Sequence, residues 1–239
     1  MLATPSIFIA CDSHDMNQCR QLAALANAHG QGLKLGLEFF SSHGPEGVQA
    51  IQHAHPDMPI FMDLKLHDIP NTVGAAVRSL CACITPAYIT VHASGGAVMM
   101  RTARDNAPGT TDILAVTVLT SLDSAALASI GQDSDHGEQV QRLAKLADSS
   151  GMDGIVCSAA ELGAIRNNLR NDFICMVPGI RPANSLHGDQ KRVSTPQTAI
   201  QAGASHIVIG RPITQADDPD AALSLICRDI DEAGNAATG

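Results

Sequence analysis

Tryptophan is absent from this 239-residue chain, and tyrosine occurs only once. Proteins that bind single-stranded nucleic acid stack the bases on aromatic side chains, so that class is disfavoured. Positive charge is also scarce, since 15 Lys and Arg stand against 24 Asp and Glu and leave a formal net charge of −9. Binders of nucleic acid or of acidic membranes normally carry the opposite balance. We therefore expect neither partner, and an anionic substrate would need positive charge supplied locally.

Long hydrophobic runs and paired cysteines are missing as well. No stretch approaches the roughly 20 apolar residues of a membrane span, and the opening MLATPSIFIACD lacks the basic segment and long apolar run of a signal peptide. The seven cysteines include no CxxC pair, which favours buried thiols in a reducing compartment over disulfides or zinc. No set of His, Cys and carboxylate residues has the spacing of metal ligands. We predict a cytoplasmic protein without a metal site.

Apolar residues, in contrast, are plentiful: 45% of the chain is hydrophobic and 16% charged, which allows a large core. Short apolar runs recur with amphipathic stretches between them, and most are continuous, as in parallel strands covered on both faces. The expected strands span residues 6–12, 32–36, 59–65, 87–93, 112–120, 153–158, 172–178 and 205–211. No linker interrupts this order, which predicts an α/β fold with a single (β/α)₈ barrel domain over residues 1–239.

A doubly wound open sheet is the alternative fold, and it would carry a Gly-rich phosphate fingerprint after its first strand. The segment ACDSHD at that position has no such pattern. The amphipathic stretches agree with the barrel, because two of them end in Gly30 and Gly151, placed as helix C-caps. Pro70 fits the first turn of the helix that follows the third strand.

The active site of such a barrel lies at the C-terminal ends of its strands, and the charges of this chain gather there. Asp63 and Lys65 are two residues apart on one strand, so both point to the same side. Lys34 on the preceding strand can complete an array of alternating charge with them. A plain structural ion pair remains the alternative, although buried pairs stabilise little on average. Asp68 follows in the loop before Pro70, where it has the alternative role of a carboxylate favoured by the helix dipole.

Two glycine–arginine segments indicate a phosphate site. VPGIRP follows the seventh strand and IGRPI ends the eighth, and the loops after these strands often hold phosphate in barrels. Backbone N–H groups of Gly179, Gly210 and Arg211 together with a guanidinium suit a dianion. Ordinary turns with surface arginines are the alternative. Between the two segments runs a long polar stretch, residues 181–196, of the length that lids often have.

The stretch DLKLHDIPNT closely resembles the signature of orotidine 5′-phosphate decarboxylases, with its Asp-x-Lys-x-x-Asp core. That core is similar in hexulose-phosphate synthase and keto-gulonate-phosphate decarboxylase, whereas PGIR and a glutamine in the lid resemble the nucleotide decarboxylase. Val177 departs from the family pattern, in which many relatives carry Thr. The resemblance covers nearly the whole chain through Asp12, Lys34, Thr120, Arg181, Gln190 and Arg211.

The resemblance implies a carboxy-lyase that converts orotidine 5′-monophosphate to uridine 5′-monophosphate and CO₂ in pyrimidine biosynthesis, without a cofactor. Lys65 would donate the proton to C6 of the pyrimidine, held charged and aimed by Asp63, Asp68 and Lys34. A Mg²⁺-dependent sugar-phosphate decarboxylase or aldolase of the same barrel group is the runner-up. A barrel that binds a nucleotide without turnover is the alternative from another class.

The resemblance also implies roles in substrate binding and assembly. Asp12 and Lys34 would hold ribose hydroxyls, Thr120 the pyrimidine edge, and Gln190 would bridge base and phosphate. The phosphate would lie against Arg181, Gly210 and Arg211. The active unit would be a homodimer in which the residues that reach the site of the partner subunit are Asp68, Ile69 and Thr72.

Overall fold

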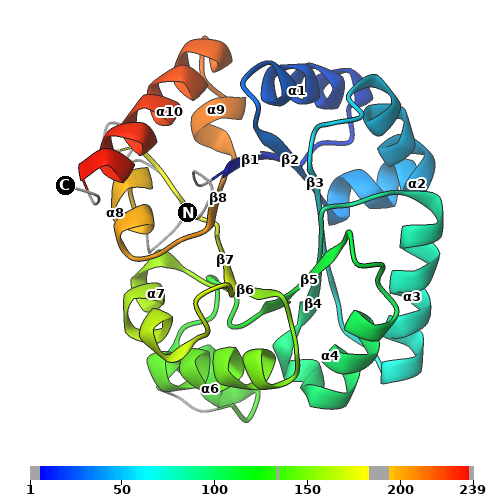
Figure 1. Ribbon diagram of the computed structural model, residues 1–239, viewed down its shortest axis with the longest axis vertical. Coiled ribbons are helices and arrows are strands. Elements are labelled where there is room, and N and C mark those ends of the chain that lie inside the picture. Colours follow the sequence, from blue (N-terminus) through cyan, green and yellow to red (C-terminus); the bar gives the residue numbers. More distant parts are fainter. Residues whose placement is uncertain (1–5, 133–134, 183–193, 237–239) are drawn as a thin grey trace.

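The apolar runs form a closed barrel of parallel strands, paired in the order β1-β2-β3-β4-β5-β6-β7-β8 with β8 returning to β1. A computed structural model describes residues 6–132, 135–182 and 194–236. The strands are β1 (Ser6–Cys11), β2 (Gly32–Gly36), β3 (Ile60–Leu66), β4 (Tyr88–His92), β5 (Asp112–Val116), β6 (Gly154–Val156), β7 (Ile174–Val177) and β8 (His206–Ile209). Helices surround this ring of strands (Figure 1). The prediction of a (β/α)₈ barrel is confirmed.

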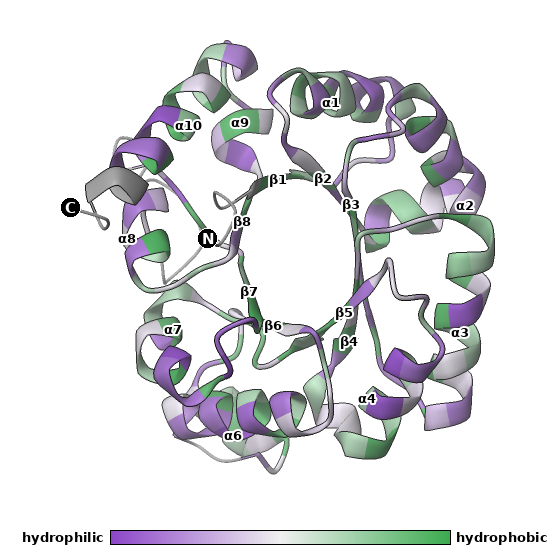
Figure 2. Cartoon of the chain, in the orientation of Figure 1, coloured by the Kyte–Doolittle hydropathy of each residue, from purple (hydrophilic) through white to green (hydrophobic). Residues whose placement is uncertain are grey.

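Alternation along each strand divides the core into two layers, because successive side chains of a strand point to opposite faces. Ile7 and Ile9 of β1 pack in the outer layer against the helices, whereas Phe8 and Ala10 point into the barrel. Figure 2 shows the strands as largely hydrophobic and the outer faces of the helices as mixed. The centre of the ring is filled by side chains, among them Phe8, Ala10, Phe61, Leu114, Val116, Val156, Met176 and Val208.

The helices begin and end at residues that suit those positions. Gly30 and Gly151 lie just beyond two helices with φ of 63° and 76°, the left-handed conformation that glycine adopts without a steric penalty. Pro70 is the first residue of α3, as predicted. The helices are α1 (Met16–Ala28), α2 (Leu37–Ala54), α3 (Pro70–Cys83), α4 (Gly96–Asp105), α5 (Ser124–Ser129), α6 (His136–Ser149), α7 (Ala159–Ile165), α8 (Pro196–Gln201), α9 (Arg211–Thr214) and α10 (Pro219–Ala236), with short 3₁₀ turns at Ala93–Gly95 and Arg166–Asn168.

Several strand ends differ from the prediction. β5 ends at Val116 instead of residue 120. The predicted strand was too long because Val118 and Leu119, which line the cavity, keep the sequence apolar after strand pairing has stopped. β8 ends at Ile209, so that Arg211 opens α9 instead of closing the strand. β2 keeps its predicted bounds, and Lys34 is its middle residue.

Candidate active site

A cavity of about 500 Å³ opens at the C-terminal ends of the strands. Its walls come from residues on or just after every strand except β4. The apolar part of the wall includes Phe61, Val116, Leu119, Val156 and Val208. A polar ligand in this cavity would therefore meet water-excluding side chains on one side and a few charged groups at fixed positions, which is the usual build of a small-molecule site.

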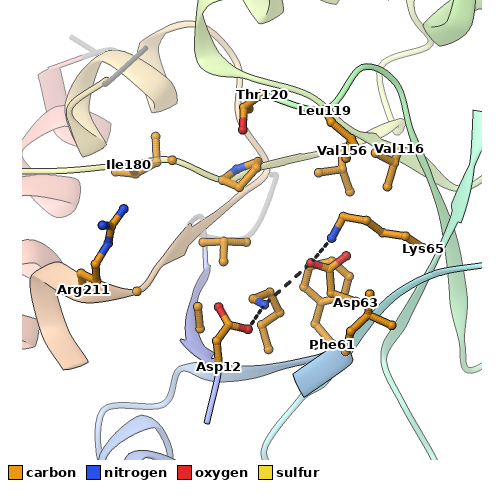
Figure 3. A pocket seen from close by; sticks show the side chains of 18 of the residues that line it. Asp12, Phe61, Asp63, Lys65, Val116, Leu119, Thr120, Val156, Ile180 and Arg211 are labelled. Atoms are coloured by element: carbon orange, nitrogen blue, oxygen red, sulfur yellow. Dashed lines mark hydrogen bonds and ion pairs between the residues drawn. The ribbon is translucent and has the colours of Figure 1, made fainter. Parts of the chain in front are cut away.

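Alternating charges form a chain along one wall of the cavity (Figure 3). Lys65 Nζ lies 2.7 Å from Asp63 Oδ2, and Lys34 Nζ lies 3.7 Å from that same oxygen. Lys34 Nζ also donates to Asp12 Oδ1 at 2.8 Å. The structure thus brings together all the residues of the predicted array and adds Asp12 to it.

The array is buried at its centre and open at its end. The side chains of Lys34 and Asp63 are 9% and 13% exposed, whereas that of Lys65 is 29% exposed and faces the cavity. Gly36 leaves room for the array, because a Cβ there would lie 2.9 Å from Asp12 Oδ1 and 3.1 Å from Lys34 Nζ. Burial disfavours each charge, and the opposite charge beside it offsets that penalty.

The backbone at Lys65 is unusual. Its φ of 50° is the one positive value at a non-glycine residue among the described residues, and such a conformation costs roughly 1–3 kcal/mol. The pairing of β3 with β4 shifts register between Met62 and Leu66, so the strand bulges at Asp63 and Lys65. In this bulge Lys65 N–H donates to Thr90 Oγ1 at 2.9 Å.

Thr90 is a site residue that the sequence analysis missed. Its hydroxyl accepts from Lys65 N–H and donates to Asp63 Oδ1 at 3.0 Å, and the residue is fully buried in β4. The only signal in the sequence is a single threonine within the mainly apolar run AYITVHA.

The predicted phosphate residues Arg181, Gly210 and Arg211 all line the cavity. Gly210 and Arg211 lie at the start of α9, and Arg181 follows β7 with only 5% exposure. Arg181 N–H donates to Ser194 O at 2.9 Å, which ties the segment after β7 to the segment before α8. Arg211 and Lys65 lie on opposite sides of the view in Figure 3. Gln190 and most of the predicted lid lie outside the described residues.

Thr120 lies exposed at the edge of the cavity, beyond the end of β5. Asp68, Ile69 and Thr72 do not line the cavity of their own chain. Ile69 is the N-cap of α3 without a side-chain cap, and it is 65% exposed. Asp68 Oδ1 accepts from Ile69 N–H at 2.6 Å, so its carboxylate lies beside the start of α3.

His92 ends β4 close to the array, with its ring centroid 5.3 Å from that of His67. Burial lowers the pKa of His92, and the neighbouring His67 and Lys65 lower it further. This shift favours the neutral form of His92. Among residues 6–132, 135–182 and 194–236 no group of three or more His, Cys, Asp or Glu side chains is placed to hold a metal ion. No helix in this part of the chain is long and apolar enough to cross a membrane.

Comparison with known proteins gives matches along almost the whole chain. Residues 5–226 match the model of the family described as Orotidine 5′-phosphate decarboxylase / HUMPS family. The orotidine 5′-phosphate decarboxylase of Erythrobacter litoralis is 49% identical over 225 residues, covering 94% of this chain and 97% of that protein. The one of Novosphingobium aromaticivorans is 49% identical over 220 residues, covering 92% and 96%. The crystal structure of the Lactobacillus acidophilus orotidine 5′-phosphate decarboxylase has a TM-score of 0.82 at 34% identity, covering 95% of this chain and 99% of that one.

Proposed function

Because the chain belongs to the orotidine 5′-phosphate decarboxylase / HUMPS family, we propose that it converts orotidine 5′-monophosphate to uridine 5′-monophosphate and CO₂ without a cofactor. The family prediction is confirmed, and with it the prediction of a carboxy-lyase. One observation carries the proposed chemistry: an ammonium group, Lys65 Nζ, is held 2.7 Å from Asp63 at the wall of a cavity with arginines elsewhere on its lining.

The reaction breaks the bond between C6 of the pyrimidine and the carboxylate carbon, and the electron pair stays on C6. No neighbouring group of the ring can delocalise that pair, so the site must stabilise a localised negative charge. Lys65 supplies a fixed positive charge there and then transfers its proton to C6. Asp63, next to it, supplies the opposite charge that offsets the cost of partly burying an ammonium group. The neutral amine regains a proton from solvent after the product leaves.

The remaining residues of the cavity bind the nucleotide. We assign the ribose hydroxyls to Asp12 and Lys34, which already share a hydrogen bond at 2.8 Å, and the pyrimidine edge to Thr120. The phosphate is assigned to Arg181, Gly210 and Arg211, and Gln190 to a bridge between base and phosphate. The apolar wall at Val116 and Val156 then faces the ring and limits the access of water.

The biological setting follows from the product, a pyrimidine nucleotide, and places the reaction in pyrimidine biosynthesis. We take residues 1–239 as one catalytic domain. All seven cysteines are free thiols, which suits a reducing compartment such as the cytoplasm.

The runner-up is a sugar-phosphate decarboxylase or aldolase, which the shared Asp-x-Lys-x-x-Asp core and the breadth of the family description favour. An assay of the purified chain separates the two. With orotidine 5′-monophosphate as substrate, the ultraviolet absorbance of the solution should fall as uridine 5′-monophosphate forms. With a β-keto acid sugar phosphate as substrate, no turnover should be seen. Turnover of the sugar phosphate with an inert nucleotide would reverse the assignment.

We further propose that the active unit is a homodimer with shared sites, in which Asp68, Ile69 and Thr72 complete the cavity of the partner subunit. Support comes from their position: none lines the cavity of its own chain, and Ile69 presents a large apolar side chain to solvent at 65% exposure. Asp68 would then lie across from Lys65 of the other subunit as its second flanking carboxylate.

Mixing two inactive variants tests the shared site. Lys65→Ala and Asp68→Ala proteins should each lack turnover, yet a mixed dimer has one site that lacks both groups and one that is intact. After random exchange of equal amounts, half of the dimers are mixed, so activity should reach about one quarter of wild type. The control replaces the second protein by the Lys65→Ala/Asp68→Ala double variant, which cannot restore a site. Exchange proven by mass spectrometry without recovered activity would place Asp68 in its own subunit.

A further inference from the structure

We propose that Thr90 is a positioning residue for this reaction, whose hydroxyl sets the direction of both the Asp63 carboxylate and the Lys65 side chain. The proposal rests on the proposed function and assigns a role to a residue that does not line the cavity. It is carried by two hydrogen bonds that meet at one buried oxygen, Thr90 Oγ1.

The first hydrogen bond holds the backbone of Lys65. Between the pairs Met62–Ile89 and Leu66–Val91, four steps along β3 run beside two steps along β4. Lys65 lies in this bulge with φ of 50°, and its N–H donates to Thr90 Oγ1 at 2.9 Å. The Cβ direction of Lys65 depends on this conformation, so the contact to Thr90 helps to aim its ammonium group at the cavity.

The second hydrogen bond holds the carboxylate of Asp63. Thr90 O–H donates to Asp63 Oδ1 at 3.0 Å, while Asp63 Oδ2 contacts Lys65 Nζ at 2.7 Å and Lys34 Nζ at 3.7 Å. Because a carboxylate is planar and rigid, fixing Oδ1 also fixes the direction in which Oδ2 meets the two ammonium groups.

Burial protects the two hydrogen bonds of Thr90 from competition by water. Thr90 has no exposed surface, so water does not reach its hydroxyl to replace either contact. Burying a hydroxyl costs free energy unless it is hydrogen-bonded. The Thr90 hydroxyl is used as both donor and acceptor, to Asp63 and from Lys65. Phe61 and Val116 line the cavity next to these groups but offer no polar atom that could do the same.

Thr90→Val keeps the shape of the side chain and removes the hydroxyl. A displacement of the reacting group by about 1 Å costs roughly 10²-fold in rate, so kcat should fall by about 10²-fold. KM and the dissociation constant of uridine 5′-monophosphate should change less than about threefold, because the phosphate contacts lie elsewhere and Lys34 keeps its hydrogen bond to Asp12. Thr90→Ser, which keeps the hydroxyl, should retain kcat within about threefold of wild type.

A matched control is available at Thr111, which is 1% exposed and donates to Pro86 O at 2.8 Å, outside the cavity lining. Thr111→Val should lower the melting temperature and leave kcat unchanged. If Thr90→Val does not fold, Thr90→Cys replaces it, because a thiol is a weak donor in a side chain of similar size. Its kcat should then fall at least tenfold below that of Thr90→Ser.

The outcomes separate this proposal from the function on which it rests. Wild-type protein without turnover of orotidine 5′-monophosphate would overturn both. Active wild type with equal kcat in Thr90→Val, or equal kcat in Thr90→Ser and Thr90→Cys, would overturn the role of Thr90 alone. Parallel losses in kcat and nucleotide affinity would likewise overturn it, since they would mark a residue that only supports the fold.

Discussion

Replacing Lys65 with alanine should abolish nearly all turnover of orotidine 5′-monophosphate and still leave binding of uridine 5′-monophosphate measurable. In the proposed mechanism the variant loses a general acid, worth roughly 10²–10⁴-fold. It also loses a preorganised charge at the atom where negative charge develops, worth roughly 10²–10³-fold for a single donor. The affinity survives because Asp12, Arg181 and Arg211 also line the cavity and can contact the nucleotide. Steady-state kinetics and titration calorimetry give the two values.

Two further variants sharpen this test. Lys65→Arg keeps the positive charge but cannot give up a proton, so it should also lose most of the turnover. Lys145→Ala serves as the control, since this lysine is exposed on α6, far along the chain from the array. Retention of a tenth of the wild-type kcat by Lys65→Ala would end the assignment of Lys65 as the proton donor.

Replacing Arg211 with alanine should lower kcat/KM for orotidine 5′-monophosphate by roughly 10²-fold or more, because a charge-assisted hydrogen bond contributes about 1.5–3 kcal/mol and a bidentate pair more. The net charge of −9 repels a phosphate dianion, so in the proposed site the local cation at the start of α9 would carry much of the attraction. If this contact also assembles the site, kcat falls together with the affinity.

The control substrate is orotidine, which lacks the phosphate and has nothing for Arg211 to bind. Its slow turnover should barely change in Arg211→Ala. Equal losses on the nucleotide and on orotidine would mean that Arg211 supports the fold or the chemical step, and that the phosphate lies elsewhere in the cavity.

Periodicity was sufficient to predict the barrel and most of the charged array. Residues of equal parity on a strand share a face, so Lys34 on β2 and Asp63 on β3 could be placed inside the barrel while Leu33 and Met62 pack outside it. The ends of strands were harder to predict, because the apolar side chains of Val118 and Leu119 line the cavity and do not belong to the sheet.

Two features of the site follow from tertiary structure and have no local signal. The left-handed backbone of Lys65 lies where the register shifts between β3 and β4. The segment DLKLHD has no glycine, the residue that usually marks such a position. Thr90 reaches Asp63 from a strand 27 residues further along the chain. Its hydroxyl therefore meets Asp63 only once β3 and β4 are paired.

The central claim is that the charges of the chain itself perform the decarboxylation, with Lys65 as the cation at the reacting carbon. The most direct test measures the turnover of orotidine 5′-monophosphate by metal-stripped protein in excess chelator. We expect the same kcat as in untreated protein with or without added Mg²⁺. Turnover that disappears in chelator and returns with Mg²⁺ would contradict the claim and would assign the electrophile to a metal ion.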